Sequence, residues 1–408
     1  MYLPVISPVA PILRVDRIAS LDLIRGIAVL GILAINIAGF AGPSAGTDTP
    51  WLPHRASPAD EVAFALTFVL FEGKMRALFS MLFGASMLLF VERADTARRN
   101  GEMLQLRRLG WLVLFGWLHY VLFWWGDILF VYAVSGFFAL TLRRVPDATL
   151  LVLALMIFTL WHGWGMAGSL GEIIDTISPA AQHQAMAATL SHMQIEMAQA
   201  RLGFVAQIAD KLATAPGWPV TMTLYTIGET LPLMLLGMVL LRGGFFAGEW
   251  PRRRLIALAS VGLTLGTAWT LAVLDWAWPR HFPATVMPDI LAYWAGPAHL
   301  LMALGYAAAI MLAAPHLLMT WPGQRLRAAG RMAFSNYLGT TIVMTAIFYG
   351  WGAGLYGRIT PALQPLFVLG GWALMLGWSK PWLTRFRQGP LEWAWRSLTE
   401  WRAMPWRL

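Results

Sequence analysis

Long apolar runs alternate with short polar segments along the 408-residue chain. A membrane-spanning helix needs about 20 mainly apolar residues. Runs that approach or exceed this length lie at residues 21–42, 74–92, 107–125, 127–142, 148–165, 219–241, 255–275, 289–317, 331–350 and 361–380. The pattern therefore predicts an all-α protein, a polytopic transmembrane helix bundle with ten spans. A further apolar stretch, residues 61–71, is too short to span; it either lies in the interface, re-enters the membrane or adds an eleventh segment.

The positive charges indicate how this bundle is oriented. Most of the 30 Lys and Arg residues fall in every second loop, and cytoplasmic loops of membrane proteins carry an excess of these residues. This distribution predicts that both termini are cytoplasmic, in a single membrane domain over residues 1–408 with a tail at 381–408. Residues 166–218 then form an extracytoplasmic loop. Within it, Ser178-Pro179 is a helix start signal, and methionines at helical spacing predict an amphipathic helix over the outer face.

Composition supports a membrane protein and excludes several kinds of site. Hydrophobic residues make up 58% of the chain and charged residues 12%, compared with about 25% charged residues in soluble domains. The absence of cysteine excludes disulfides, thiol nucleophiles and cysteine-based metal sites. No His or carboxylate cluster has ligand spacing, so no metal is expected. The net charge of +9 fits the cytoplasmic loops, so membrane lipids, not nucleic acid, are the expected partners. A homodimer is compatible with the sequence, but no feature specifies one.

Three polar residues share one face of the first span. Asp22 and Arg25 are one helical turn apart, and Asn36 follows Arg25 by eleven residues, about three turns. Asn36 therefore lies about 16 Å farther along the helix than Arg25. One interpretation is a cationic anchor at the cytoplasmic mouth, connected by a polar path to an amide donor beyond the midplane. The alternative is structural: Asp22 and Arg25 pair, and Asn36 joins neighbouring helices.

His119 and Asp127 lie on either side of the Trp125-Gly126 turn, where they could meet. A histidine oriented by a carboxylate is a candidate general base. The structural alternative is a buried histidine with a hydrogen-bond partner, followed by an aspartate that caps the next helix.

The remaining candidates are charged or polar groups in or near other spans. Ionisable groups in a membrane segment cost about 2.5–3.5 kcal/mol each on insertion scales. Lys74 and Arg76 open the second span on its outer side, either as a solvated helix end or as an anion or oxyanion site. Tyr225 and Glu229 are four residues apart on one helix face, and Glu229 is either protonated or paired with Lys74 or Arg76. Further candidates are Arg331, Asn336 and Tyr337 at the cytoplasmic mouth, and His54 in the first outer loop. His299, alone in mid-membrane, is interpreted as structural.

Five blocks of sequence, in order along almost the whole chain, resemble the YeiB-type bacterial membrane family, a domain of unknown function. The blocks are "LDLIRGIAVLGILAINI", "MRALFSMLFGASM", "LHYVLFWWGDIL", "GRMAFSNYLGTT" and "RFRQGPLEWAWRSLT". That family is similar to the transmembrane acyltransferases, which include heparan-α-glucosaminide N-acetyltransferase and the type-three acyltransferases. The resemblance implies a bacterial inner-membrane protein that takes an acyl group, as in acetyl-CoA, from acyl-CoA in the cytoplasm. The acceptor is an extracytoplasmic glycan or other small molecule.

The resemblance also implies roles for individual residues. Asp22 and Arg25 match the start of the first-span signature, and Arg25 and Arg331 would hold the CoA phosphates. Type-three acyltransferases have a catalytic histidine eleven residues after this arginine, where the present chain has Asn36. An amide cannot act as a base, but it can donate to an oxyanion. The base is then His119 or His54, and His119 is favoured because a carboxylate can orient it.

The sequence thus predicts an acyl-CoA-dependent transmembrane acyltransferase, with two other functions left open. Its catalytic residues are His119, Asp127 and Asn36, with His54 as the other candidate base. Asn336 and Tyr337 line the CoA path, and Lys74, Arg76, Tyr225 and Glu229 set the electrostatics of the site. The first alternative is a transporter or channel that uses intramembrane Glu, His and Lys residues as a relay. The second is a non-catalytic membrane scaffold or receptor.

Overall fold

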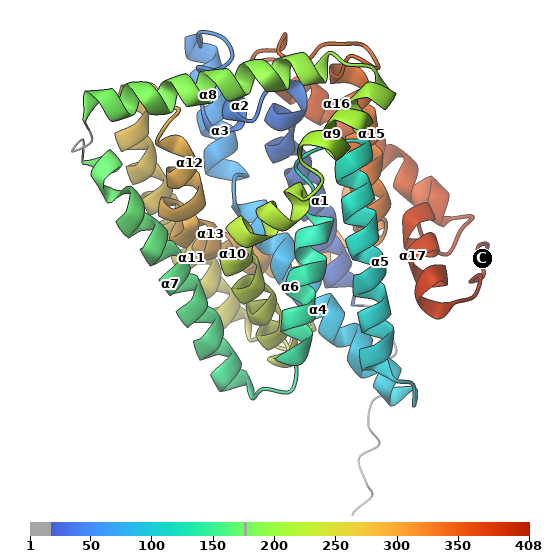
Figure 1. Ribbon diagram of the computed structural model, residues 1–408. Helices are drawn as coiled ribbons and strands as arrows, with labels where there is room; N and C mark the ends of the chain where they lie inside the picture. Colours follow the sequence, from blue (N-terminus) through green and yellow to red (C-terminus); the bar gives the residue numbers. More distant parts are fainter. Residues whose placement is uncertain (1–17, 175–177) are drawn as a thin grey trace, which may run out of the picture.

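The computed structural model describes residues 18–174 and 178–408, which are helical with connecting loops and contain no β-strand. The elements are α1 (Ala19–Ala41), α2 (Ala45–Asp48), α3 (Pro58–Leu70), α4 (Lys74–Thr96), α5 (Gly101–Leu122), α6 (Leu129–Thr141), α7 (Asp147–Ile173), α8 (Pro179–Ala200), α9 (Phe204–Thr214), α10 (Trp218–Arg242), α11 (Arg252–Ala277), η1 (Trp278–Arg280), α12 (Met287–Asp289), η2 (Ile290–Trp294), α13 (Gly296–Leu317), α14 (Trp321–Arg331), α15 (Ala333–Phe348), α16 (Gln364–Leu383) and α17 (Pro390–Glu400) (Figure 1).

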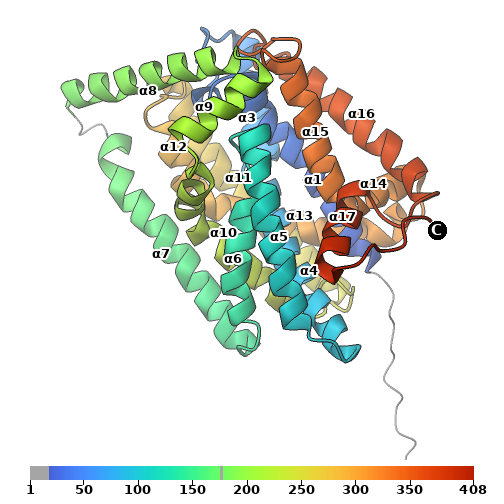
Figure 2. The same cartoon turned by 45° about the vertical axis from the view of Figure 1, so that its right-hand side comes forward.

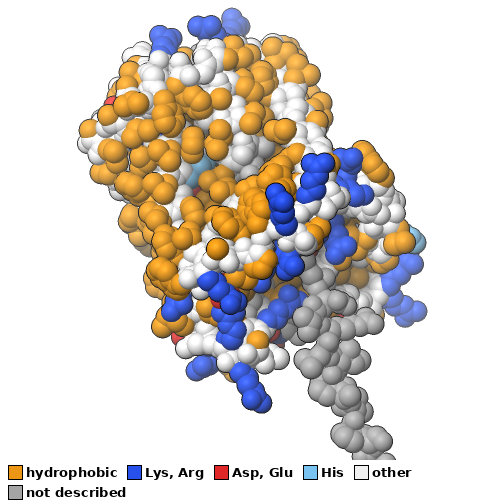
Figure 3. All heavy atoms as spheres, turned by 90° about the vertical axis from the view of Figure 1, so that its right-hand side faces the viewer, with side chains coloured by type: hydrophobic (Ala, Val, Ile, Leu, Met, Phe, Trp, Pro, Cys, Tyr) orange, Lys and Arg blue, Asp and Glu red, His pale blue; other side chains and the backbone are white. Residues whose placement is uncertain are grey.

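In these ranges, six helical segments are long and apolar enough to cross a membrane. They are α1, the continuous pair α3–α4, α7, α10, α11 with η1, and α13. Helices α6 and α15 are apolar but shorter. Hydrophobic side chains cover a broad band on one face of the molecule, and Lys and Arg gather toward its ends, more of them at the lower one (Figure 3). The prediction of an all-helical membrane protein is confirmed, whereas the number of ten spans stays a prediction.

Helix α1 lies in the core and packs against α4, α14, α15 and α16. It is apolar over most of its length, and it ends at Gly42, before Pro43, because proline disfavours a helical residue in front of it. Its N-terminal half touches α14 closely: a Cβ on Gly26 would lie 2.0 Å from the carbonyl oxygen of Leu326. Small residues of this kind allow membrane helices to approach each other backbone to backbone.

Helix α8 lies across one end of the bundle (Figures 1 and 2). It begins where the sequence predicts, with Pro179 in its first turn and the Ser178 hydroxyl accepting a hydrogen bond from the amide of Ala181. Most of its side chains are exposed. The Glu196 carboxylate holds it to the segment after α1, accepting bonds of 2.8 and 3.0 Å from the amide and hydroxyl of Ser44. The loop is shorter than predicted, because α7 continues past residue 166 to Ile173.

A break between α3 and α4 divides one long apolar segment in two. The backbone turns at Gly73, whose φ is +69°, and a Cβ there would lie 2.0 Å from Nδ1 of His299. Both the backbone angle and the contact require glycine. Lys74 therefore lies inside the molecule with none of its surface exposed. The expectation of a solvated helix end is wrong for Lys74, because α3 precedes it and extends toward the end that α8 covers (Figure 1). The Arg76 side chain keeps 32% of its surface exposed.

The C-terminal helix α17 returns to the bundle and packs on α5 and α15. Its Glu392 caps the first turn of α15: one carboxylate oxygen accepts from the amides of Phe334 and Ser335 at 2.8 and 3.1 Å, and the other bonds to the Ser335 hydroxyl at 2.5 Å. A carboxylate at a helix N-terminus satisfies amides that would otherwise lack partners. The tail is thus part of the folded structure.

We expect the docking of α17 to weaken as the pH rises. Burial raises the pKa of the Glu392 carboxyl above its ordinary value, although the bonds from Ser335 oppose this. The folded state therefore binds this proton more tightly than the unfolded state. The stabilising contribution is complete below the unfolded pKa and is lost as the pH rises through the folded pKa. Hydrogen exchange of the α17 amides should accelerate, beyond the intrinsic pH effect, as the pH rises above the ordinary pKa of a glutamate side chain.

The variant Glu392→Gln is the matched control for this prediction, because its neutral amide can make the same contacts as the protonated acid. We expect its α17 amides to show no additional acceleration over this pH range. Equal pH dependence in both proteins would contradict a role for Glu392.

Candidate functional site

His119 and Asp127 form a buried pair at the C-terminal end of α5. Nδ1 of His119 lies 2.8 Å from Oδ1 of Asp127, and their side chains are 0% and 2% exposed. The other Asp127 oxygen accepts a 2.8 Å bond from the amide of Phe130, near the start of α6. Asp127 thus does what both interpretations of the sequence require: it caps the start of α6 and also holds the imidazole.

This geometry leaves one histidine nitrogen available. With Nδ1–H donating to the carboxylate, Nε2 carries the free lone pair. Nε2 of His119 is buried and has no hydrogen-bond partner in the described part of the chain. A buried polar atom without a partner is rare in folded proteins. The arrangement can therefore accept a proton from a molecule that reaches Nε2.

Tyr337 of α15 lies beside this pair and not with Asn336. Its ring centroid is 5.3 Å from that of His119, and its hydroxyl donates a 3.3 Å bond to the carbonyl of Gly126. The backbone of Asn336 is adjacent, but its side chain points to α14 and α16. There Asn336 bonds to Ala329, Ser379 and Trp378 at 2.8–3.1 Å. The two residues were predicted to line one CoA path, but consecutive helical positions point about 100° apart.

Trp124 connects the C-terminal ends of α1 and α5. Its indole N–H donates a 3.1 Å bond to the carbonyl of Gly39, and its ring lies 4.2 Å from that of Phe40. Asn36 is about one turn before these two residues on α1. Its side chain is partly exposed and makes no hydrogen bond within residues 18–174 and 178–408. Asn36 therefore has an amide available for a ligand.

At the other end of the same face, Arg25 and Asp22 form an ion pair. Their side-chain atoms are 2.9 Å apart, and Arg25 also donates a 2.6 Å bond to the Ser86 hydroxyl of α4. Arg331 donates to the carbonyl of Arg387 at 3.1 Å. The structural pairing of Asp22 with Arg25 is thus confirmed, and Arg25 keeps 21% of its side-chain surface exposed.

A second polar cluster lies at the break between α3 and α4. Arg76 pairs with Glu229 of α10, with Nη2 and Oε2 3.0 Å apart and side chains 32% and 7% exposed. Glu72 lies within electrostatic range of both residues and of Lys74. The Lys74 ammonium donates a 2.6 Å bond to the carbonyl of Phe68. Of the two predicted partners for Glu229, Arg76 is therefore the one that pairs with it.

Tyr225 does not belong to this cluster. Its side chain is 63% exposed, whereas Glu229 is 5% exposed. Positions four apart differ by about 40° around a helix. Here that angle is enough to move Tyr225 from the packed side of α10 to its exposed side.

Two histidines complete the cluster, and neither is among the functional residues predicted from the sequence. His299 is 1% exposed and packs on Gly73, and neither of its ring nitrogens has a partner in the described residues. His162 of α7 bonds through Nδ1 to the carbonyl of Phe158 at 2.9 Å, while its Nε2 is unpartnered. Both interact electrostatically with Arg76. In the sequence, each of these histidines is marked only as a polar residue within an apolar run. Such a residue can belong to a functional site or can simply pack in the core, so the pattern does not separate the two.

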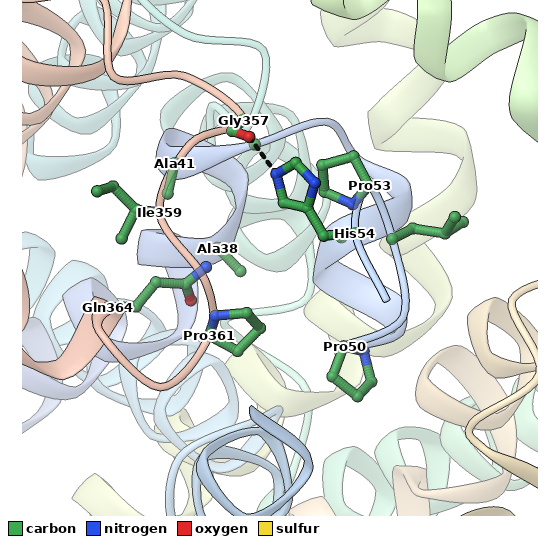
Figure 4. A pocket seen from close by; sticks show the side chains of 12 residues that line it. Ala38, Ala41, Pro50, Pro53, His54, Gly357, Ile359, Pro361 and Gln364 are labelled. Atoms are coloured by element: carbon green, nitrogen blue, oxygen red, sulfur yellow. Dashed lines mark hydrogen bonds between the residues drawn. The ribbon is translucent and has the colours of Figure 1, made fainter. Parts of the chain in front are cut away.

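His54 lies apart from these clusters, in the loop between α2 and α3. It is exposed, and Nε2 contacts the carbonyl oxygen of Gly357. Figure 4 shows it at the edge of a narrow pocket between the end of α1 and the loop before α16. Nε2 of His54 is thus engaged by a backbone carbonyl. In the described ranges no group of three or more His, Asp or Glu residues is arranged to hold a metal ion.

Comparison with known proteins places the chain in a family. The model for "Protein of unknown function (DUF418)" matches residues 240–402. The chain is 31% identical to the uncharacterized protein YxaH of Bacillus subtilis, over 96% of this chain and 96% of that protein. It is 30% identical to the uncharacterized protein YeiB of Escherichia coli, over 94% of this chain and 96% of that protein.

An uncharacterized 39.9 kDa protein of Bacillus acidopullulyticus is 28% identical, over 97% of each chain. No solved structure matches. The names of these relatives state no activity, so they support the family and leave the acyl-transfer prediction untested. The resemblance carried by the five sequence blocks is thereby confirmed at the level of the family: the chain belongs to the YeiB-type membrane proteins that contain the DUF418 domain.

Proposed function

We propose that the protein is a membrane acyltransferase. It would move an acyl group, as in acetyl, from cytoplasmic acyl-CoA to a sugar or related acceptor on the outer side of the bacterial inner membrane. The observation that carries this proposal is the buried His119–Asp127 pair with its unpartnered Nε2. A general base held by a carboxylate is what acyl transfer to a hydroxyl or amine requires.

In the proposed reaction, Nε2 of His119 takes the proton of the acceptor hydroxyl while its oxygen attacks the thioester carbon. Asp127 stabilises the imidazolium that forms. The Asn36 amide donates to the carbonyl oxygen as negative charge develops there. The C–S bond then breaks, and the leaving CoA thiolate receives the proton from His119. The acyl ester and free CoA are the products, so no other reactant is needed.

The proposal requires donor and acceptor to reach the site from opposite sides. We propose ten spans with both termini in the cytoplasm, and one membrane domain over residues 1–408 whose outer end is covered by α8. The asymmetric distribution of Lys and Arg among the loops supports this orientation. The tail after residue 380 would then lie on the donor side.

A transporter is the second candidate, and the break between α3 and α4 favours it. Interrupted helices that place charged groups inside a bundle are typical of transporters. Lys74, Arg76 and Glu229 lie at such a break. If the protein is a transporter, proton-coupled uptake of its substrate into liposomes should be lost in the variant Glu229→Gln.

Release of the CoA thiol tests the proposal directly. The full-length protein in nanodiscs would be incubated with labelled acetyl-CoA and an extract of envelope glycans. A thiol-reactive dye reports free CoA with no background from the protein, because the chain has no cysteine. We expect thiol release together with label in the glycan fraction. Absence of both thiol release and label in the glycan fraction would overturn the proposal, whether or not acetyl-CoA binds in calorimetry.

A further inference from the structure

The guanidinium of Arg108 lies between two aromatic rings from different parts of the chain. Its Cζ is 4.1 Å from the ring centroid of Phe90 in α4 and 4.2 Å from that of Trp395 in α17. The indole N–H of Trp395 donates a 2.8 Å bond to the backbone carbonyl of Arg108, which holds this ring in position. The two rings pack on the faces of the planar guanidinium. Its N–H groups lie in the guanidinium plane and therefore do not point at the rings.

These N–H groups have no acceptor in the part of the chain that the structure describes. Within the described residues, no side chain or carbonyl accepts a hydrogen bond from the Arg108 guanidinium. It is neither fully buried nor fully exposed. A guanidinium normally uses its five donors in a fork that matches carboxylate or phosphate. Arg108 therefore presents an unused, oriented donor set at a partly open position.

Two further arginines lie near Arg108. Arg25 of α1 and Arg396 of α17 are both within electrostatic range of it and repel it. The acidic neighbours offset part of this charge, because Asp22 pairs with Arg25, and Glu400, which is hydrogen bonded to Arg99, also interacts with Arg396. Arg108 itself has no carboxylate partner among the described residues. Like charges brought together from three helices are unfavourable unless an anion lies between them.

We propose that Arg25, Arg108 and Arg396 form a binding site for a phosphate-bearing anion. Phosphate is the ligand that several guanidinium groups recognise best, because each can donate two parallel bonds. The site lies in the part of the bundle away from α8, where α17 packs on α5 (Figure 2). Identifying the anion as acyl-CoA rests on the proposed function, and an anionic lipid headgroup offers the same phosphate chemistry.

This site differs from the one expected from the sequence. Arg331 was the predicted partner of Arg25, but it bonds to the backbone of Arg387. Arg108 and Arg396 take its place. The tail residues Trp395 and Arg396 therefore supply one ring and one charge of the site.

Calorimetry with the full-length protein in nanodiscs of neutral phosphatidylcholine tests the site. The probes are CoA, 3′-dephospho-CoA and inorganic phosphate. We expect the variant Arg108→Gln to weaken CoA binding about 10- to 100-fold, the loss expected for hydrogen bonds to a charged group. The matched control is Arg107→Gln, because Arg107 is the exposed neighbour that lies over Trp401, 5.9 Å from its ring centroid. We expect this control to bind CoA as the unsubstituted protein does.

Two more measurements identify the anion and separate this proposal from the proposed function. Retention of phosphatidylglycerol in native mass spectra, lost in Arg108→Gln only, would support the site with a lipid headgroup as its ligand. CoA binding that depends on Arg108, without any thiol release, would support the site and contradict acyl transfer. If Arg108→Gln and Arg107→Gln behave alike with CoA, phosphate and phosphatidylglycerol, the site is overturned.

Discussion

Replacing His119 with alanine is expected to lower the rate of acyl transfer about 100- to 10,000-fold, the usual contribution of a general base. The imidazole is the group whose free nitrogen can take the acceptor proton, and its carboxylate partner is already in place at 2.8 Å. Thiol release from acetyl-CoA, with the glycan acceptor present, measures the rate. CoA affinity should stay close to that of the unsubstituted protein, since the base does not touch the phosphates.

His162→Ala is the matched control for this loss. His162 is also buried and also has an unpartnered Nε2, but its Nδ1 bonds to a backbone carbonyl and no carboxylate orients it. We expect its rate to remain within about twofold of the original, well inside the range that a general base controls. A rate for His119→Ala within twofold of the original would contradict the assignment of the base.

Removing Arg76 is expected to destabilise the protein by about 3 kcal/mol. The Glu229 carboxylate would then stay buried without its partner, and breaking a buried ion pair typically costs 3–5 kcal/mol. The lower end applies because Arg76 keeps 32% of its side-chain surface exposed. Thermal unfolding followed by intrinsic fluorescence, with 22 tryptophans as reporters, should show a lower melting temperature for Arg76→Met.

The double variant Arg76→Met with Glu229→Gln separates the charge from the packing. Because it leaves no unpaired buried charge, its melting temperature should lie above those of both single variants. This follows from the asymmetry between breaking a buried pair and replacing it. Equal melting temperatures for Arg76→Met and the unsubstituted protein would show that the pair does not stabilise the fold.

The sequence was informative where chemistry and local spacing decide the structure. His119 and Asp127 meet because they flank one tight turn, and eight residues of chain leave few alternatives. The partner of Glu229 could be narrowed to Lys74 or Arg76, because a charge buried in an apolar span must be compensated by an opposite charge.

Other features depend on packing that the linear pattern does not contain. Glu72 and Gly73 mark a break before Lys74 in the sequence, but the sequence does not show that Gly73 packs against His299, a residue on another helix. The helices that pack against α10 determine which of its sides is exposed. The spacing of Tyr225 and Glu229 in the sequence does not contain this information. The arrangement around Arg108 could not be predicted from spacing, because Trp395 reaches it only when the tail returns to α5.

The docking of α17 also has a consequence for biosynthesis. Membrane spans enter the bilayer in order as the chain is made, but Trp395 and Arg396 lie near its C-terminal end. The proposed anion site around Arg108 cannot be complete until α17 has been synthesised. A chain that lacks α17 would thus carry the His119–Asp127 pair without the proposed anion site, so the synthesis of α17 determines when that site can form.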